Sequence, residues 1–132
     1  MEPKIKGVHH IALKARGIEE FNKTLDFYCG ILGMPVVRRW GEGEKQAVMV
    51  DTGAGMLEIF ANGADRPESG ALRHLAFAVE NTDVCIEAVR KAGYEITMEP
   101  RELLIASEPP LPARIGFCIG PVGEEVEFFQ EK

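Results

Sequence analysis

Two histidines and two glutamates of this chain carry the donor atoms of a metal site. His10 and His74 each begin a segment of alternating residues, whereas Glu58 and Glu127 are lone glutamates among apolar residues. Two imidazole nitrogens with two carboxylate oxygens suit zinc, nickel, cobalt, manganese or iron, and an octahedral ion so held keeps two positions for water or a bidentate substrate. These residue types therefore indicate the Lewis-acid chemistry of a divalent cation.

The cost of burying a carboxylate is the physical reason to expect a cation here. An unpaired carboxylate in a low-dielectric place is strongly destabilised unless it is paired or binds a metal. Each residue considered alone has another explanation that needs no metal. A histidine can form a local hydrogen bond, and a glutamate can lie on a solvated face. Because the four residues recur at matching positions, the pattern favours a metal site.

An internal repeat relates the four residues. His10-Ile-Ala-Leu superposes on His74-Leu-Ala-Phe with an offset of 64 residues, and each histidine opens a strand that leads into an amphipathic helix. The glutamates follow at similar distances, since Glu58 lies 48 positions after the first histidine and Glu127 lies 53 after the second. A repeated unit of strand, helix and further strands predicts two modules packed as pseudo-symmetric halves of one domain.

Strand phase decides which side chains share a face of the sheet. His10 shares its face with Ala12 and Lys14, and His74 shares its face with Ala76 and Ala78, because alternate residues of a strand point the same way. Both histidines therefore stand on a face lined by small residues, where a ligand has room. The same alternation predicts that His9 points to the outer side of the sheet as a bystander, with Arg73 at its place in the second half.

The elements that must position these residues follow from periodicity. The first predicted helix covers residues 18–32 and ends at Gly33, and the second begins at Asn81 and ends at Gly93. The predicted strands cover residues 8–15, 46–51, 55–61, 72–79, 94–99, 114–119 and 124–130. A polar loop is expected over residues 62–70. The proline-rich stretch 101–114 is expected to lack regular structure, either as a lid over the site or as a surface connection.

Composition excludes several classes of function. A chain of 132 residues with 45% hydrophobic content suits one soluble domain, and the net charge of -6 without a basic block argues against nucleic acid and anionic membranes as partners. Neither an apolar run of membrane-spanning length nor a signal-peptide pattern is present, so the expected location is the cytoplasm. The three cysteines, an odd number at no metal-finger spacing, are expected to be reduced and mostly buried.

The motifs that carry these residues resemble the vicinal oxygen chelate superfamily, which includes glyoxalase I (lactoylglutathione lyase), methylmalonyl-CoA epimerase, extradiol dioxygenases and antibiotic-resistance proteins. The resemblance covers nearly the whole chain and rests on four segments, Val8-His-His10-Ile-Ala-Leu, Leu25-Asp-Phe-Tyr28 with Leu32-Gly33-Met34, His74-Leu-Ala-Phe-Ala-Val, and Glu125-Val-Glu127-Phe. It implies an α+β fold of two βαβββ modules, at about residues 7–66 and 70–132, each curling an incomplete barrel around a metal.

The resemblance also implies a ligand set and an assembly. His10, Glu58, His74 and Glu127 match the two-histidine, two-glutamate set of glyoxalase I, which holds one divalent ion per site, with nickel or zinc favoured over cobalt or manganese. Methylmalonyl-CoA epimerases commonly place glutamine where this chain has Glu58, so this position favours glyoxalase-like chemistry. Members with a single domain usually form homodimers, and their sites can take ligands from one chain or from both.

A proton transfer next to a carbonyl is the reaction that the resemblance implies. The metal stabilises the enediolate formed when the proton leaves, and a carboxylate near the metal takes the proton and returns it to the neighbouring carbon. Glu127 is the expected base, with Glu58 second. In glyoxalase I this reaction converts the hemithioacetal of a 2-oxoaldehyde and a thiol into a 2-hydroxyacyl thioester.

Substrate recognition is less strongly indicated. Asn62 and Lys14 occupy family positions associated with glutathione, although Asn62 before Gly63 is equally typical of a turn. The turn Gly120-Pro-Val-Gly123 departs from the family's Asp-Pro-Asp-Gly, which bears on the substrate more than on the metal. Arg38 and Arg39 are either contacts for an anionic group or a solvated strand end.

Two other functions stay open. One is an epimerase acting beside a thioester or sugar carbonyl. The other is a binding protein that sequesters an antibiotic without chemistry, although such relatives lack the metal ligands. A dioxygenase is disfavoured because those sites use two histidines and one carboxylate.

Overall fold

The computed structural model describes residues 8–64, 72–107 and 109–132. The chain divides into two compact units, Met1–Arg66 and Pro67–Lys132. Of the predicted polar loop over 62–70, residues 65–70 lie outside the described residues, as do Gly7 and residue 108 of the proline-rich stretch.

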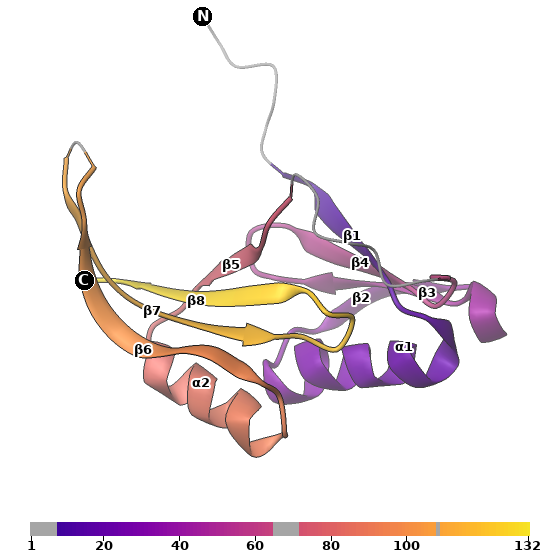
Figure 1. The fold of residues 1–132 in the computed structure, drawn as a ribbon. Helices are drawn as coiled ribbons and strands as arrows, with labels where there is room; N and C mark the ends of the chain where they lie inside the picture. The colour runs from indigo at the N-terminus through magenta and orange to yellow at the C-terminus, as the bar shows by residue number, and fades with distance from the viewer. Residues whose placement is uncertain (1–7, 65–71, 108) are drawn as a thin grey trace, which may run out of the picture. The chain divides into compact units, whose positions relative to one another are not determined.

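The first unit is a four-stranded sheet with one long helix (Figure 1). Its sheet has the order β1-β4-β3-β2, in which β1 pairs with β4 in parallel and the other neighbours are antiparallel. The elements are β1 (His10–Lys14), α1 (Gly17–Leu25), the π-helical η1 (Asp26–Ile31), β2 (Val36–Trp40), the 3₁₀ turn η2 (Gly43–Lys45), β3 (Ala47–Asp51) and β4 (Met56–Phe60).

The second unit has the same topology. Its sheet has the order β5-β8-β7-β6, again with one parallel pair, β5 with β8, and antiparallel neighbours elsewhere. The elements are β5 (Leu75–Ala78), α2 (Thr82–Lys91), β6 (Ile96–Ile105), β7 (Leu111–Ile119) and β8 (Glu125–Glu131). The predicted α+β fold of two βαβββ modules is therefore confirmed.

Strand register shows how closely the repeat is kept. Ala12 pairs with Glu58 across β1 and β4, and Ala76 pairs with Glu127 across β5 and β8. On the antiparallel side, Glu58 pairs with Met49, whereas Glu127 pairs with Phe117. Each glutamate therefore has an alanine on one flank, and each predicted histidine lies two residues before that alanine.

Each helix covers the apolar face of its own sheet. In the first unit Phe21, Phe27 and Tyr28 are buried, as are Leu57 and Ile59 on the face of β4 opposite Glu58. A fully buried side chain of this kind contributes roughly 1.5–3 kcal/mol relative to an exposed one. The apolar side of β4 thus packs in the core of its unit, and Glu58 lies on the other face of the strand.

The packing of α2 depends on a glycine in β7. A side chain at Gly116 would begin 2.8 Å from Cγ1 of Ile86, a buried residue of α2. The absence of a side chain there lets the helix lie close to the sheet of the second unit.

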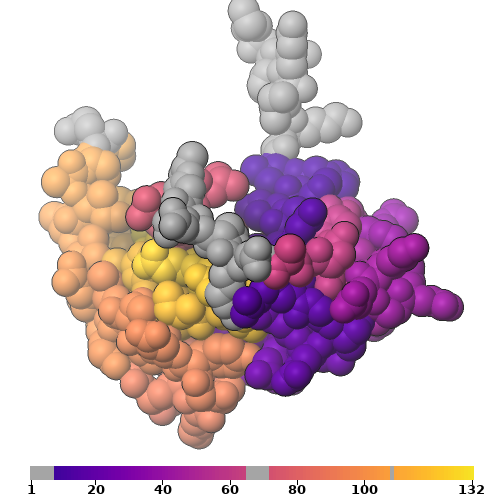
Figure 2. All heavy atoms as spheres, turned by 45° about the vertical axis from the view of Figure 1, so that its right-hand side comes forward, coloured from indigo at the N-terminus to yellow at the C-terminus, as the bar shows by residue number. Residues whose placement is uncertain are grey.

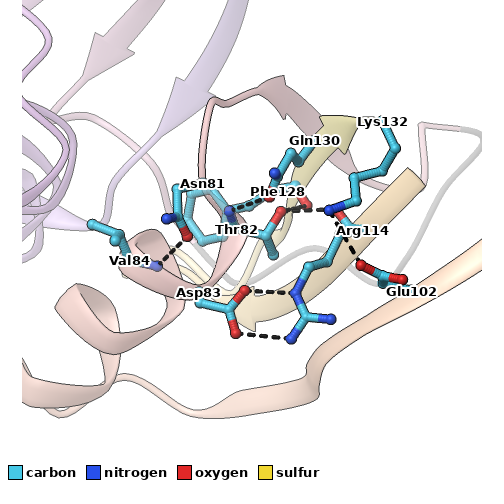
Figure 3. Close-up of polar contacts among 9 residues, drawn as sticks. All are labelled: Asn81, Thr82, Asp83, Val84, Glu102, Arg114, Phe128, Gln130 and Lys132. Carbon is cyan, nitrogen blue, oxygen red and sulfur yellow. Dashed lines mark hydrogen bonds and ion pairs between the residues drawn. The ribbon is translucent and has the colours of Figure 1, made fainter. Parts of the chain in front are cut away.

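The start of α2 is tied to β7 and β8 by polar contacts (Figure 3). The Asn81 side chain accepts a hydrogen bond from the Val84 amide at 3.1 Å, as expected for a helix N-cap. The buried Thr82 hydroxyl donates to the Arg114 carbonyl at 2.7 Å, and Arg114 donates through Nε and Nη2 to the Asp83 carboxylate at 2.6 and 2.9 Å. These contacts join the helix start to the sheet that carries Glu127.

The Asp83 contact predicts a pH-dependent stability. The Arg114 guanidinium lowers the pKa of the Asp83 carboxyl, so the folded state favours its charged form. The stabilisation is therefore present above the ordinary aspartate pKa and is lost as the pH falls through the lowered value. Asp83→Asn should lower the melting temperature at neutral pH, by less at acidic pH and at high salt. A pH-independent difference in thermal unfolding would contradict this assignment.

The stretch 101–114 is more regular than predicted. β6 continues to Ile105 and β7 begins at Leu111, so only a short connection remains between them. Proline is tolerated because β6 is an edge strand and Pro100 lies where its register with β7 shifts. Pro112 is the second residue of β7, beside the end of β8. The expectation of an irregular segment is therefore wrong for these strands.

The structure also tests the predictions for the first helix, the paired arginines and the cysteines. The helix predicted over 18–32 is present, and its second half is π-helical. Arg38 and Arg39 are exposed on the edge strand β2. The three cysteines are free, and burial raises the pKa of the Cys118 thiol to about 12, which keeps it protonated. None of the helices among the described residues is long and apolar enough to cross a membrane.

Candidate metal centre

The first unit places His10 and Glu58 side by side. His10 begins β1, and Glu58 lies in the middle of β4, the parallel neighbour of β1. The His10 Nε2 atom lies 3.4 Å from Glu58 Oε1. The histidine side chain is 38% exposed and the glutamate 15%, so the pair opens to one side of the sheet. One nitrogen and one oxygen donor thus face the same space.

The second unit repeats this pair with His74 and Glu127. The His74 Nε2 atom lies 3.1 Å from Glu127 Oε1. The glutamate side chain is only 9% exposed, and the ring of Phe117 packs edge-on against His74 with centroids 5.5 Å apart. Glu127 is therefore more enclosed than Glu58, whereas the two histidines are similarly exposed.

Burial has an electrostatic consequence for Glu127. Removal from water raises the pKa of its carboxyl, and the neighbouring His74 opposes that rise. A carboxylate that has lost hydration binds a proton more tightly and gains more from a nearby cation than a solvated one does. Both properties suit a residue that holds a metal and exchanges a proton.

Each unit holds one pair of candidate donors, a histidine and a glutamate. Among residues 8–64, 72–107 and 109–132, the structure shows no group of three or more His, Cys, Asp or Glu side chains in metal-binding geometry. His10 and Glu58 belong to the first unit, and His74 and Glu127 belong to the second. Each pair offers an imidazole nitrogen and a carboxylate oxygen at short range, a donor chemistry that fits half of a four-ligand zinc or nickel site.

Comparison with known proteins places the chain in a family. Residues 7–105 match the model of the Glyoxalase/Bleomycin resistance protein/Dioxygenase superfamily. The chain belongs to this superfamily. The resemblance of its motifs to the vicinal oxygen chelate proteins, which is another name for the same group, is therefore confirmed.

Individual members of the superfamily are similar along most of their length. The uncharacterized protein YwkD of Bacillus subtilis is 27% identical over 135 residues, which covers 96% of this chain and 98% of that protein. A lactoylglutathione lyase of Escherichia coli O157:H7 is 27% identical over 123 residues, with 87% of each chain covered. The crystal structure of SMU.1112c superposes with a TM-score of 0.76 at 26% identity and covers 96% of this chain and 99% of that one.

The residues predicted to bind substrate lie at the far end of β1. Lys14 shares the face of His10 but stands four residues on, about 13 Å along the strand. Its Nζ lies 6.0 Å from the centre of the Phe60 ring. The backbone of Asn62 bridges to that of Arg16, and the Gly63 amide donates to the Ala15 carbonyl at 2.8 Å. The Asn62 backbone thus has a structural role in closing this end of the unit, while its side chain is exposed.

His9 differs from the prediction. Its Nδ1 atom lies 2.9 Å from Nδ1 of His10, and the two rings meet edge-on at 81° with centroids 5.2 Å apart. The prediction of His9 as a bystander does not include this contact, which forms at the residue directly before β1. The doubled histidine was the only sequence signal for this contact.

A hollow lies toward the ends of β5 and β8, and neither His74 nor Glu127 is among the residues that line it. It is lined by residues of β5 and β8 and by those that follow β5, namely Ala76, Ala78, Val79, Glu80, Phe129, Gln130 and Glu131. Atoms of β8 reach the surface of this unit in Figure 2, where they are yellow. Ala76 pairs with Glu127 and Ala78 with Phe129, so the alanines that line the hollow include the strand neighbour of the glutamate.

Proposed function

We propose that this protein is a metal-dependent lyase or isomerase of the glyoxalase I type. In this proposal His10, Glu58, His74 and Glu127 together hold one divalent ion, nickel or zinc first, and the two units form one domain around it. The observation that supports it best is the pair of equivalent His-Glu contacts, at 3.4 and 3.1 Å, on matching strands of two equivalent sheets. The similarity to a lactoylglutathione lyase gives independent support.

The proposed reaction moves a proton from one carbon to the next. The substrate is the hemithioacetal of a 2-oxoaldehyde such as methylglyoxal with a thiol, of which glutathione is the first candidate. Glu127 removes the proton from the carbon that bears sulfur and returns it to the neighbouring carbon, while the hydroxyl proton of the first carbon passes to the oxygen of the second, which leaves a 2-hydroxyacyl thioester with all atoms retained. The bound ion supplies charge stabilisation for the substrate oxygens. Glu58 is the second candidate for the base.

The chain's own residues support these roles. Because burial raises the pKa of Glu127, this carboxylate is a stronger base than a solvated glutamate. Phe117 holds the His74 ring beside it. The hollow is lined by Ala76, Ala78 and Phe129 together with polar residues that include Glu80 and Glu131, and its apolar part suits the small carbon skeleton of a 2-oxoaldehyde.

Metal analysis followed by an activity assay tests the proposal. The purified protein is analysed for bound metal and then assayed for thioester formation from methylglyoxal and glutathione with zinc, nickel, cobalt or manganese. We expect one ion per four-ligand site and metal-dependent thioester formation. Bound metal without glutathione-dependent activity would replace the proposal with an epimerase. A protein without metal affinity would be a binding protein instead.

A substitution in the hollow tests where the substrate binds. Ala78→Phe places a phenyl group beside Phe129, in the space proposed for the substrate. We expect KM to rise by about tenfold, a loss of roughly 1.4 kcal/mol of binding. Zinc affinity should stay unchanged, since Ala78 is not a donor. An unchanged KM in steady-state kinetics would place the substrate elsewhere.

A further inference from the structure

The contact between His9 and His10 assigns a hydrogen-bonding role to a residue outside the four-ligand set. His9 precedes β1 and is exposed, so it contributes little to the core. Its Nδ1 atom is nevertheless at hydrogen-bond distance, 2.9 Å, from Nδ1 of His10. The other nitrogen of His10, Nε2, is the one that lies beside Glu58 Oε1. The two nitrogens of the His10 ring therefore face two different partners.

The chemistry of imidazole restricts how these partners share protons. A neutral imidazole has one N–H donor and one bare nitrogen acceptor. If Nε2 of His10 binds a metal, that atom must be bare, and the proton of the ring must sit on Nδ1. The Nδ1–H of His10 then points at His9, and only a bare Nδ1 of His9 can accept it. The His9 proton consequently lies on its Nε2, toward solvent.

We propose that His9 accepts this hydrogen bond and thereby fixes both the tautomer and the ring orientation of His10 for metal binding. His9 is in this sense a positioning residue, and the inference rests on the function proposed above. Metal-bound histidines generally donate their second ring N–H to a partner that orients the ring, and loss of that partner typically lowers metal affinity by about 10- to 100-fold.

The second unit shows why the first unit needs such a partner. The ring of His74 is held by the edge of Phe117, which pairs with Glu127 in the register of β7 and β8. The residue at the same register position beside Glu58 is Met49, whose side chain is flexible. The residue before His74 is Arg73, whose guanidinium can only donate. We infer that packing orients one histidine and a hydrogen bond orients the other.

Two substitutions at His9 separate shape from hydrogen bonding. His9→Phe keeps a flat ring and removes the acceptor. His9→Asn keeps an acceptor, because Oδ1 of asparagine is separated from Cβ by one atom, as is Nδ1 of histidine. Arg73→Ala is the matched control at the equivalent position of the second unit. Thermal unfolding of each variant without metal checks that the fold is kept.

Zinc affinity is the first measurement, made by competition with a coloured chelator. We expect His9→Phe to weaken zinc binding by about 10- to 100-fold, His9→Asn to stay within a few-fold of the unmodified protein, and Arg73→Ala to bind as the unmodified protein does. A His9→Phe variant with unchanged zinc affinity would overturn the role of His9 alone. An unmodified protein that binds no zinc would overturn the proposed function as well.

The tautomer of His10 is the second measurement, and a merely structural role for His9 would not predict it. Long-range ¹H–¹⁵N correlation spectra of the zinc-loaded protein should show His10 with its proton on Nδ1 and zinc on Nε2. In His9→Phe we expect this signal to lose its protection from exchange with water. A zinc-bound Nδ1 in the unmodified protein would overturn the proposal.

Discussion

Replacement of Glu127 with glutamine is expected to leave the fold intact and to lower turnover at least about a hundredfold, the lower end of what a positioned proton-transfer group contributes. Glutamine keeps the shape of the side chain but cannot take a proton from carbon. The measurement is kcat for thioester formation with methylglyoxal and glutathione, at saturating zinc or nickel. Near wild-type turnover in this variant would rule out Glu127 as the base.

Two comparisons make the Glu127 result specific. Glu125→Gln changes a carboxylate of the same strand and the same face of the sheet, two residues before Glu127, and we expect turnover close to wild type because Glu125 is not among the proposed ligands. The metal-free Glu127→Gln protein should melt no lower than the unmodified protein at neutral pH. Its amide replaces a carboxylate whose ionised form is disfavoured by burial, as the raised pKa of Glu127 indicates. A large loss of stability would instead attribute the lost turnover to misfolding.

Loss of either proposed histidine ligand is expected to abolish tight zinc binding. The unmodified protein should bind one zinc ion per chain, and His10→Ala and His74→Ala should each lose it, because one ion needs donors from both pairs. Lys14→Ala, on the same face of β1 as His10, should keep its zinc. Elemental analysis and chelator competition provide the readout. Two ions per unmodified chain, with one left in each variant, would show that each pair binds separately.

Mixing the two histidine variants then shows whether the donors of one site come from one chain or from two. If sites are shared across a homodimer, a mixed dimer of His10→Ala and His74→Ala chains has one site with all four ligands, and the mixture regains part of the activity. If each site lies within a chain, the mixture stays inactive. The comparison needs chains that exchange between dimers, which mixed unfolding and refolding ensures.

Strand alternation explains why the candidate donors could be predicted from sequence. The side chains of Leu57 and Ile59 had to face a helix, so Glu58 had to face away from it, and the structure agrees. The same period places Ala76 and Ala78 on one face of β5, and His74, the residue before that strand, lies beside Glu127. These features depend on local periodicity and on pairing between neighbouring strands, both of which leave a pattern in the sequence.

Other features depend on interactions that leave no such pattern. Pro100 and Pro112 indicate a loop by composition, yet their places at an edge strand and beside a strand end make them compatible with a long hairpin. The π-helical turn of η1 has the same apolar spacing as an ordinary helix. The His9 contact arises at a strand boundary, which is the least predictable part of an element.

The two units also bear on how such a protein can arise and diverge. One unit alone carries a histidine and a glutamate, and a two-fold symmetric dimer of such units would present two of each. When the two copies are fused in one chain, each copy can acquire substitutions independently of the other. This chain shows the result: the copies keep the same strand order and donor types, but one has enclosed its glutamate and packed its histidine against phenylalanine. The other has kept its glutamate more open and has gained a neighbouring histidine. In the function proposed above, duplication supplies the ligand symmetry, and the broken symmetry lets Glu127 act as the base while Glu58 remains an anchor.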